Sequence, residues 1–418
     1  MTSGRARAFK SDLSGQNTSR QKVPGVSARQ RILILGLSTR AIAESAVRGG
    51  YDVLTLDYFG DRDQRELVEN YSLMRDFHLG FSSRALLEAS RHLDFEAVVY
   101  NSNLENHPDV VEELAQGHVL LGNTPQTLRE VRHWPTLRSF CGEAGVPFPA
   151  TLFAGEGLPE GGCWLRKPVR SGGGHGISFW RGEPLDENHL LQEYIEGIHA
   201  SAAFVADGRD CVLLGVTEQL IGREELGARG FAWCGNILPL ALPLSLLDAV
   251  EDVAAKLTRR FCLRGVNGFD FVLARREGRL IPYLVEVNPR YTASMELMEW
   301  VYGLNIFDLH VCSFEGELPT FSLRESIHQP GFYGKGIVYA REDALMPETA
   351  GWRQKGRRDI PFSGERIGAR HPICTVLAQG ESRDECWRCL LAKSDAVRGE
   401  IMEGGERGTT NWFFEATA

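Results

Sequence analysis

The sequence predicts a mixed α/β and α+β protein, and three patterns carry that prediction. Apolar runs at 31–36, 52–57 and 97–103 alternate with helical patterns, as in an open sheet of buried parallel strands. Residues 265–290 read as two strands joined by a tight connection. Beyond Gly331, strand patterns precede an amphipathic helix near 383–400, which predicts a small C-terminal α+β domain.

The composition of the chain excludes several classes of protein. The chain has 418 residues, 43% of them hydrophobic, which is enough for two to four domains with real cores. A formal charge of −9 argues against a nucleic-acid binder. The sequence contains no apolar run of membrane-spanning length and no secretory segment at its start. The nine scattered cysteines are therefore expected to be reduced thiols, and we expect a cytoplasmic protein without membrane partners.

We divide the chain into four parts. Residues 1–29 are polar and basic and are expected to be a disordered tail. An α/β open-sheet domain follows at 30–124, a central domain at 125–320 and the C-terminal α+β domain at 321–418. Within the central domain we predict a single helix from Pro125 to Ala144, stopped by a Gly-Val-Pro-Phe-Pro segment.

Four residues in the C-terminal part have spacings that suit zinc. They give H-x₂-C and C-x₂-C and are His371, Cys374, Cys386 and Cys389. The alternative is that the cysteines are small core residues on the inner face of the predicted helix. Both interpretations stay open at this point.

The predicted hairpin at 265–290 brings acids together. If it is centred on Gly278, with a connection of three residues, Asp270 lies opposite Glu286. Strand alternation places Asn288 on the same face. Two carboxylates and an amide oxygen suit Mg²⁺, and Arg290 follows to hold a negatively charged group.

The alternative for this hairpin is a surface ribbon with charged residues on its solvent side. The apolar opposite face weakens it; that face carries Phe269, Phe271, Val285 and Val287. An unpaired Asp–Glu cross-strand pair is also repulsive without a cation. Pro282 lacks an N–H group, so its strand must be at a sheet edge or contain a bulge there.

A glycine-rich segment follows Lys167, which ends another predicted strand. Its glycines, between Ser171 and Gly176, allow close approach of the backbone to an anion, and the lysine adds positive charge. It is not a P-loop, because a strand rather than a helix follows. The alternative is a turn without a ligand. The segment Leu190–Ile195 alternates polar and apolar residues and can pair with an adenine edge through its main chain.

Polar residues also follow the N-terminal strands, where open sheets bind ligands. They are Ser38, Thr39, Arg40, Asn103, Glu105 and Asn106. The first strand is followed by G-L-S-T-R and not by G-x-G-x-x-G, so no dinucleotide site is predicted. Capping and solvation of loops is the alternative role for these residues.

Three motifs occur in a fixed order: K-P-x-x-S-G-G-G-x-G-I, Q-E-Y-I-E-G and G-F-D-F…E-V-N-P-R. Together they resemble the ATP-grasp superfamily of carboxylate–amine ligases over about residues 31–310. The resemblance implies an N-terminal parallel sheet of the pre-ATP-grasp type and an ATP-grasp fold of two α+β subdomains, with the glycine-loop subdomain at about 150–196. The family clamps ATP between these subdomains and makes an acyl phosphate, which an amine then attacks.

The resemblance also implies roles for individual residues. For ATP binding these are Lys167, Ser171, Gly172, Gly173, Gly174, Gly176, Gln192, Glu193, Tyr194, Ile195, Glu196 and His199. Asp270, Glu286 and Asn288 correspond to the metal ligands, for two Mg²⁺ ions with Mn²⁺ as a substitute. Arg290 and Lys167 correspond to catalytic residues, and Glu105, Asn106 and Arg290 to substrate-binding residues.

Two positions depart from the family pattern. His199 stands where the family has an acid for the ribose hydroxyls, and Glu196 is the alternative for that role. The chain also lacks the Asp-Lys pair that opens the helix before the Gly-Val-Pro segment. Arg132 or Arg138 is the candidate to replace the charge of that lysine.

The segment E-V-N-P-R-Y-T-A-S-M-E and the later G-K-G-I-V-Y-A resemble a branch that includes tyramine–glutamate ligases of methanofuran synthesis and proteins of one-carbon metabolism. The implied reaction joins a small-molecule carboxylate to an amine, with release of ADP and phosphate. Whether the protein forms a homodimer stays open at this point. The alternatives are a carboxylase or kinase of the same superfamily, or a nucleotide-binding regulator without turnover.

Overall fold

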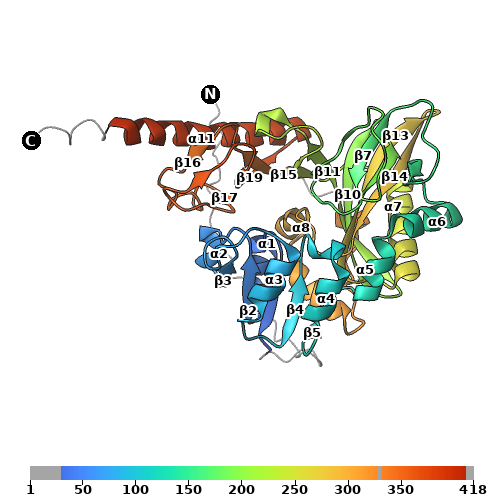
Figure 1. The fold of residues 1–418 in the computed structure, drawn as a ribbon, viewed down its shortest axis with the longest axis horizontal. Coiled ribbons are helices and arrows are strands. Elements are labelled where there is room, and N and C mark those ends of the chain that lie inside the picture. Colours follow the sequence, from blue (N-terminus) through green and yellow to red (C-terminus); the bar gives the residue numbers. More distant parts are fainter. Residues whose placement is uncertain (1–29, 327–330, 411–418) are drawn as a thin grey trace, which may run out of the picture.

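The computed structural model describes residues 30–326 and 331–410, so the predicted disordered tail lies outside the described residues. A parallel sheet at the N-terminal end lies beside a large antiparallel sheet, and a smaller antiparallel sheet projects from the central part (Figure 1). The mixed α/β class predicted from the sequence is confirmed. Within the described residues, no helix is both long and apolar enough to cross a membrane.

The N-terminal sheet has five parallel strands in the order β3-β2-β1-β4-β5. Its strands are β1 (Ile32–Leu35), β2 (Val53–Asp57), β3 (Glu69–Ser72), β4 (Ala97–Tyr100) and β5 (Val119–Leu120). Its helices are α1 (Arg40–Arg48), α2 (Arg62–Arg65), α3 (Ser83–Ser90) and α4 (Pro108–Leu114), with a 3₁₀ turn η1 (Leu104–Asn106) after β4. Every residue of β1, β2 and β4 is buried, as expected for strands covered on both faces.

The single helix predicted over 125–144 is wrong, because the structure has two helices in this segment. α5 covers Pro125–Val131 and α6 covers Trp134–Ala144. Pro135 is the second residue of α6, where it needs no hydrogen-bond donor, and the extended His133 precedes the helix. Arg132 lies at this break as the C-cap residue of α5.

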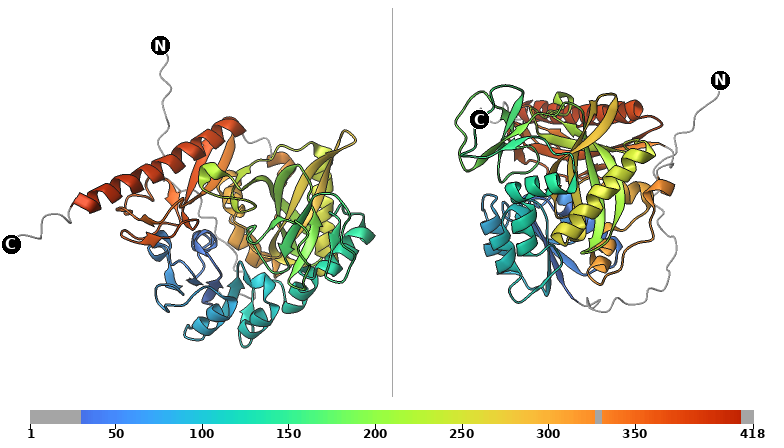
Figure 2. Two further views of the ribbon diagram at one scale, coloured as in Figure 1. Left: turned by 45° about the horizontal axis from the view of Figure 1, so that its top comes forward. Right: turned by 90° about the vertical axis from the view of Figure 1, so that its right-hand side faces the viewer.

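The large sheet has eight strands in the order β14-β13-β10-β11-β12-β15-β19-β17, all antiparallel. They are β10 (Ile198–Asp207), β11 (Cys211–Ile221), β12 (Trp233–Leu238), β13 (Arg264–Arg276), β14 (Arg279–Asn288), β15 (Phe332–Tyr339), β17 (Arg357–Arg358) and β19 (Pro372–Gly380). Strands from beyond residue 331 thus continue the central sheet. α7 (Leu244–Phe261) packs along this sheet through its apolar side (Figure 2).

A second, four-stranded sheet carries the glycine loop. It has the order β6-β9-β7-β8, with β6 (Thr151–Leu152), β7 (Trp164–Pro168), β8 (Ser178–Phe179) and β9 (His189–Glu193). The glycine loop joins β7 to β8. The remaining elements are η2 (Glu224–Leu226), α8 (Met295–Tyr302), α9 (Ile306–Ser313), α10 (Leu323–Ser326), β16 (Ala344–Leu345), β18 (Arg366–Ile367) and α11 (Arg383–Thr410).

The hairpin of β13 and β14 keeps the predicted pairing through a different local geometry. Its turn has two residues, Glu277 and Gly278, both with positive φ (50° and 80°), as type I′ turns require. The predicted three-residue connection is therefore wrong. A β-bulge leaves Val285 without a partner, and this extra residue restores the pairing of Asp270 with Glu286.

The environment of Pro282 agrees with the constraint drawn from the sequence. β14 is the edge strand of the eight-stranded sheet, so a missing N–H group breaks no ladder on its outer side. The main-chain N–H of Leu284 instead donates to the carbonyl of Pro147 (2.8 Å).

The cysteines considered for zinc lie on β19 (Cys374) and on α11 (Cys386 and Cys389). Cys374 and Cys386 are buried in the apolar core that these elements share, and His371 is exposed. Among the described residues there is no group of three or more His, Cys, Asp or Glu side chains placed to hold a metal ion.

A buried ion cluster joins the N-terminal, central and C-terminal parts. Arg40 is fully buried and binds Glu296 of α8 with two nitrogens and Asp359 with two nitrogens. Nζ of Lys335, on β15, donates to Oε2 of Glu296 (2.5 Å), which also accepts from Nη2 of Arg40. Arg40 was expected among the ligand-facing residues at the strand ends, but its guanidinium serves this cluster.

We predict that Arg40→Ala lowers the free energy of unfolding by about 3–5 kcal/mol, because it removes the arginine partner of the carboxylates of Glu296 and Asp359. Urea denaturation measures the change. Arg84→Ala is the matched control, since Arg84 is exposed and pairs with Glu113 at the surface, a contact worth about 0–1 kcal/mol. Equal losses in the two variants would contradict the assignment.

Candidate nucleotide and metal site

Two carboxylates and an amide lie on one face of the β13–β14 hairpin. Asp270 pairs directly with Glu286, so the predicted register is confirmed. Asn288 donates from Nδ2 to Oδ2 of Asp270 (3.2 Å) and accepts at Oδ1 from Nη2 of Arg290 (3.2 Å). Nε2 of Gln219, on β11, donates to Oδ1 of Asp270 (3.0 Å). The side chains predicted for a metal are thus connected to one another and to a cation.

The two carboxyl groups differ in pKa because their surroundings differ. Burial, together with the negative charge of Glu286, raises the pKa of Asp270 to about 7. Burial also opposes ionisation of Glu286, but the positive charges of Arg132 and Lys167 outweigh it and hold its pKa below the usual value. At neutral pH Glu286 is therefore ionised and Asp270 is only partly ionised, and a divalent cation would stabilise the ionised form of both.

Arg132 lies in this site, whereas Arg138 does not. Nη1 of Arg132 donates to Oε1 of Glu286 (2.8 Å), and its Nε and Nη2 donate to Oδ1 of Asn106 (3.0 and 2.7 Å). Arg138 forms a two-pronged pair with the partly exposed Glu156 (2.8 and 2.9 Å). Of the two candidates for the missing lysine charge, geometry favours Arg132.

Lys167 is held at the end of β7 by two neighbours. Its Nζ donates to Oε1 of Gln192 on β9 (3.0 Å) and lies 4.9 Å from the ring centre of Trp134. Nε1 of Trp134 donates to the carbonyl of Val169 (3.1 Å), which fixes the start of the glycine loop. Burial lowers the pKa of Lys167, and the charge of Glu286 opposes that shift. The lysine is thus a buried cation facing the carboxylate pair.

The glycine loop packs against Phe231 and Trp233, at the start of β12. The carbonyl of Gly173 accepts from the N–H of Trp233 (3.0 Å). Gly174 and Gly176 have positive φ (78° and 75°). A Cβ atom on Gly174 would lie 1.8 Å from the carbonyl oxygen of Phe231, so this approach requires glycine.

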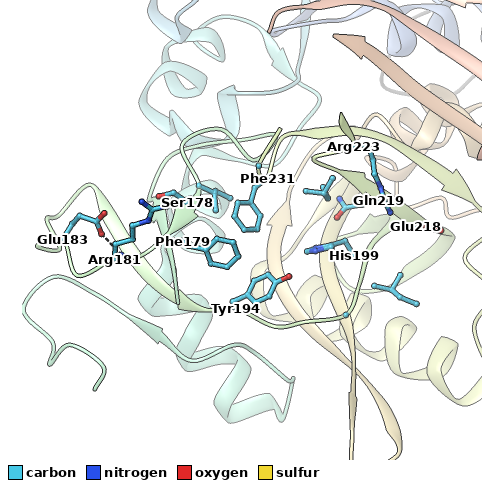
Figure 3. A pocket seen from close by; sticks show the side chains of 15 residues that line it. Ser178, Phe179, Arg181, Glu183, Tyr194, His199, Glu218, Gln219, Arg223 and Phe231 are labelled. Carbon is cyan, nitrogen blue, oxygen red and sulfur yellow. Dashed lines mark hydrogen bonds between the residues drawn. The ribbon is translucent and has the colours of Figure 1, made fainter. Parts of the chain in front are cut away.

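A pocket of about 790 Å³ lies between the glycine-loop sheet and the central sheet (Figure 3). On one side, Phe179 packs edge-on against Tyr194 and Phe231, with ring centres 5.2 and 5.4 Å apart. The opposite side is lined by His199, Gln219 and Arg223 (Figure 3). Because Gln219 also bonds Asp270, the pocket adjoins the carboxylate pair. An apolar end beside a polar, charged end suits a nucleotide.

The residues predicted to bind ATP separate into two groups. Among the described residues, Tyr194 and His199 line the pocket. The other ten predicted residues do not; they are Lys167, Ser171, Gly172, Gly173, Gly174, Gly176, Gln192, Glu193, Ile195 and Glu196. Gln192 is buried against Lys167, Ile195 belongs to a small apolar cluster and Glu196 is exposed. Burial lowers the pKa of His199, and the nearby Arg223 adds to the effect, so its ring is neutral at pH 7.

The predicted substrate residues occupy the turn after β4. Glu105 is 1% exposed and accepts at Oε1 from Nε of Arg290 (2.7 Å). Nδ2 of Asn106 donates to the carbonyl of Ser171 at the start of the glycine loop (3.3 Å), while its Oδ1 accepts from Arg132. This turn therefore contacts both arginines of the site and the glycine loop.

Most of the lining residues were not anticipated from the sequence, and four of them carry the aromatic or polar character of the pocket. They are Phe179, Gln219, Arg223 and Phe231. Gln219 had a detectable signal, because the polar run T-E-Q interrupts an otherwise apolar strand at 217–219. The other three lie at a strand end or in a loop, where periodicity gives no signal.

We predict that Gly174→Ala loosens the glycine loop, whereas Gly172→Ala does not. A Cβ atom at position 172 meets no atom within 4 Å and requires no unusual φ. Hydrogen exchange of the Trp233 amide, which is bonded to Gly173, measures the seating of the loop. We expect faster exchange only in Gly174→Ala; equal protection in both variants would contradict the close contact.

Comparisons with known proteins agree with this architecture. Residues 134–294 match the family model of the ATP-grasp domain. The chain is 22% identical over 374 residues to the uncharacterized protein MJ0776 of Methanocaldococcus jannaschii. The alignment covers 85% of this chain and 89% of that protein.

Two solved structures share the fold. One is the biotin carboxylase–β,γ-ATP complex from Campylobacter jejuni, with a TM-score of 0.66, 16% identity and coverage of 89% of this chain and 91% of that chain. The other is the L-amino acid ligase from Bacillus licheniformis, with a TM-score of 0.60, 16% identity and coverage of 88% and 96%. Residues 134–294 are thus similar to an ATP-grasp domain, and the chain shares the fold of these two proteins.

Proposed function

We propose that this protein is an ATP-dependent ligase that joins a carboxylate to an amine through an acyl phosphate and releases ADP and phosphate. The observation that carries the proposal is the Asp270–Glu286 pair beside a nucleotide-sized pocket. A binding protein without turnover has no need of a carboxylate pair connected to Asn288 and Arg290. The fold shared with an L-amino acid ligase supports the same reaction class.

The donor set fits Mg²⁺. Asp270 and Glu286 supply carboxylate oxygens and Asn288 an amide oxygen, which are hard ligands. Burial and the like charge of Glu286 across the ladder both raise the pKa of Asp270. A divalent cation would offset both effects. We propose two Mg²⁺ ions, with Mn²⁺ as a substitute; when bound they would neutralise charge on the β- and γ-phosphates.

The surrounding residues hold the nucleotide and exclude water. We assign the adenine to the aromatic end of the pocket, near Tyr194, and the ribose to the end near His199. Lys167 and the main-chain N–H groups of the glycine loop, Ser171 to Gly176, would hold the phosphates. The seating of this loop on Trp233 would keep water from the reactive intermediate.

The reaction has two steps. A carboxylate oxygen of the donor attacks the γ-phosphorus in line, and the bond to ADP breaks. The amine nitrogen then attacks the acyl carbon, loses its proton, and inorganic phosphate leaves with the bonding electron pair. Arg290 lies between Asn288 and Glu105, where it would neutralise charge that develops on the transferred group.

We place the two organic substrates at the turn that contains Glu105 and Asn106, next to Arg290. The motif that follows β14 supports a substrate pair like that of the tyramine–glutamate ligase branch, linked to methanofuran or one-carbon metabolism. The assay that tests the reaction class is release of ADP with candidate acids. Dependence on an added amine supports ligation, whereas dependence on bicarbonate supports the carboxylase alternative, which the fold shared with biotin carboxylase favours.

We predict that Glu286→Gln abolishes ADP release, with a loss of about two orders of magnitude or more, because it removes one of the two negatively charged ligands proposed for Mg²⁺. The amide oxygen can still accept from Arg132, so circular dichroism and the melting temperature should change little. Glu156→Gln, at the surface, is the matched control. Near-normal turnover in Glu286→Gln would remove the metal assignment.

We also predict that Arg132→Ala lowers kcat/KM for ATP by about 10–100-fold, while Arg138→Ala stays within about twofold. Arg132 neutralises a buried carboxylate, whereas Arg138 pairs with Glu156 in contact with solvent. Steady-state kinetics with varied ATP compares the two. If the variants lose activity equally, Arg132 is not the cation of the site.

A further inference from the structure

The C-terminal helix α11 reaches the wall of the nucleotide pocket. Arg383, its first residue, binds both carboxylate oxygens of Glu218, with Nη2–Oε1 at 2.6 Å and Nε–Oε2 at 3.0 Å. Glu218 lies on β11 and lines the pocket. Bidentate Arg–carboxylate pairs fix orientation as well as distance. The side chains are 33% and 16% exposed, so the pair is shielded from full solvent screening.

One helical turn further on, Trp387 contacts a second pocket residue. The guanidinium of Arg223 lies 5.8 Å from the ring centre of Trp387, within the range of cation–π attraction. The Nε atom of Arg223 is buried and has no hydrogen-bond partner among the residues that the structure describes. Arg223 also lines the pocket, next to His199 (Figure 3). The Arg223 side chain as a whole is half-buried, and a nucleotide bound in the pocket would supply oxygen atoms as acceptors for its guanidinium.

The same contacts extend to the glycine loop. η2, which follows Arg223, lies beside the start of α11 (Figure 1), and Leu226 in η2 belongs to the apolar core with Leu390 of α11. The chain then returns to Phe231 and Trp233, on which the glycine loop is seated. The segment 222–233 is thus held between α11 on one side and the pocket with its glycine loop on the other.

We propose that Arg383 and Trp387 are positioning residues for nucleotide binding, acting through Glu218 and Arg223. α11 then supports the pocket indirectly, through the lining residues Glu218 and Arg223. It does so although it lies outside residues 134–294, which match the ATP-grasp domain. The identity of the ligand rests on the proposed function. The alternative role for both contacts is to attach the C-terminal part to the sheet; this would affect stability but leave nucleotide affinity unchanged.

The test is isothermal titration of the full chain with MgADP. We expect Arg383→Ala and Trp387→Ala to weaken binding about tenfold, and Trp387→Phe, which keeps an aromatic face, to stay within about threefold. Arg388→Ala is the control on the same helix, since Arg388 is exposed and donates only to a main-chain oxygen of its own helix among the described residues. It should bind as the unsubstituted protein does.

Hydrogen exchange of the amides at 222–233 provides a second readout. Faster exchange in Arg383→Ala and Trp387→Ala, with the Trp387→Phe pattern unchanged, supports positioning. If both alanine variants melt at a lower temperature but bind MgADP as tightly as Arg388→Ala, the proposal is overturned. If Arg383→Ala does not fold, Arg383→Lys and the two Trp387 variants decide it in the same way. Failure of the unsubstituted protein to bind MgADP would instead refute the proposed function.

Discussion

The antiparallel register of β13 and β14 is the constraint on which the rest of the site depends. One unpaired residue, Val285, shifts the ladder so that Glu286 faces the same side as Asp270. Without that bulge the pair would separate, because a shift of one residue turns a side chain to the opposite face of a sheet. Two opposed carboxylates are unfavourable alone, so the same geometry that creates the pair also creates its demand for a cation.

Three cations from separate elements surround this pair. Arg132 comes from the break between two helices, Lys167 from the end of β7 and Arg290 from the end of β14. Each is fixed by a hydrogen bond to a neighbouring residue, so little reorganisation is needed when an anion arrives. Positive charge is therefore concentrated around the carboxylate pair, and Gln219 connects this pair to a pocket whose far side is aromatic.

Much of the fold and part of the site followed from the sequence. Continuous apolar runs predicted the N-terminal sheet, and strand alternation predicted the Asp270–Glu286 pair, because both are patterns of the local sequence. The pairing was right although the turn was not, since the bulge compensated for a shorter connection. Residues that meet only through tertiary packing were missed. Arg383 lies 165 positions after Glu218, and no periodicity relates them. The break at His133 follows local proline chemistry and was predictable; the contact of Arg132 with Glu286 was not.

The central claim is that the β13–β14 carboxylates hold the metal of a bound nucleotide. A crystal structure of the full chain with MnADP tests it most directly, because anomalous scattering locates Mn²⁺ independently of the protein model. The account predicts Mn²⁺ coordinated by oxygens of Asp270, Glu286 and Asn288, with the adenine against Tyr194. Manganese bound elsewhere, or a nucleotide outside the pocket while these three side chains keep only protein partners, would contradict it.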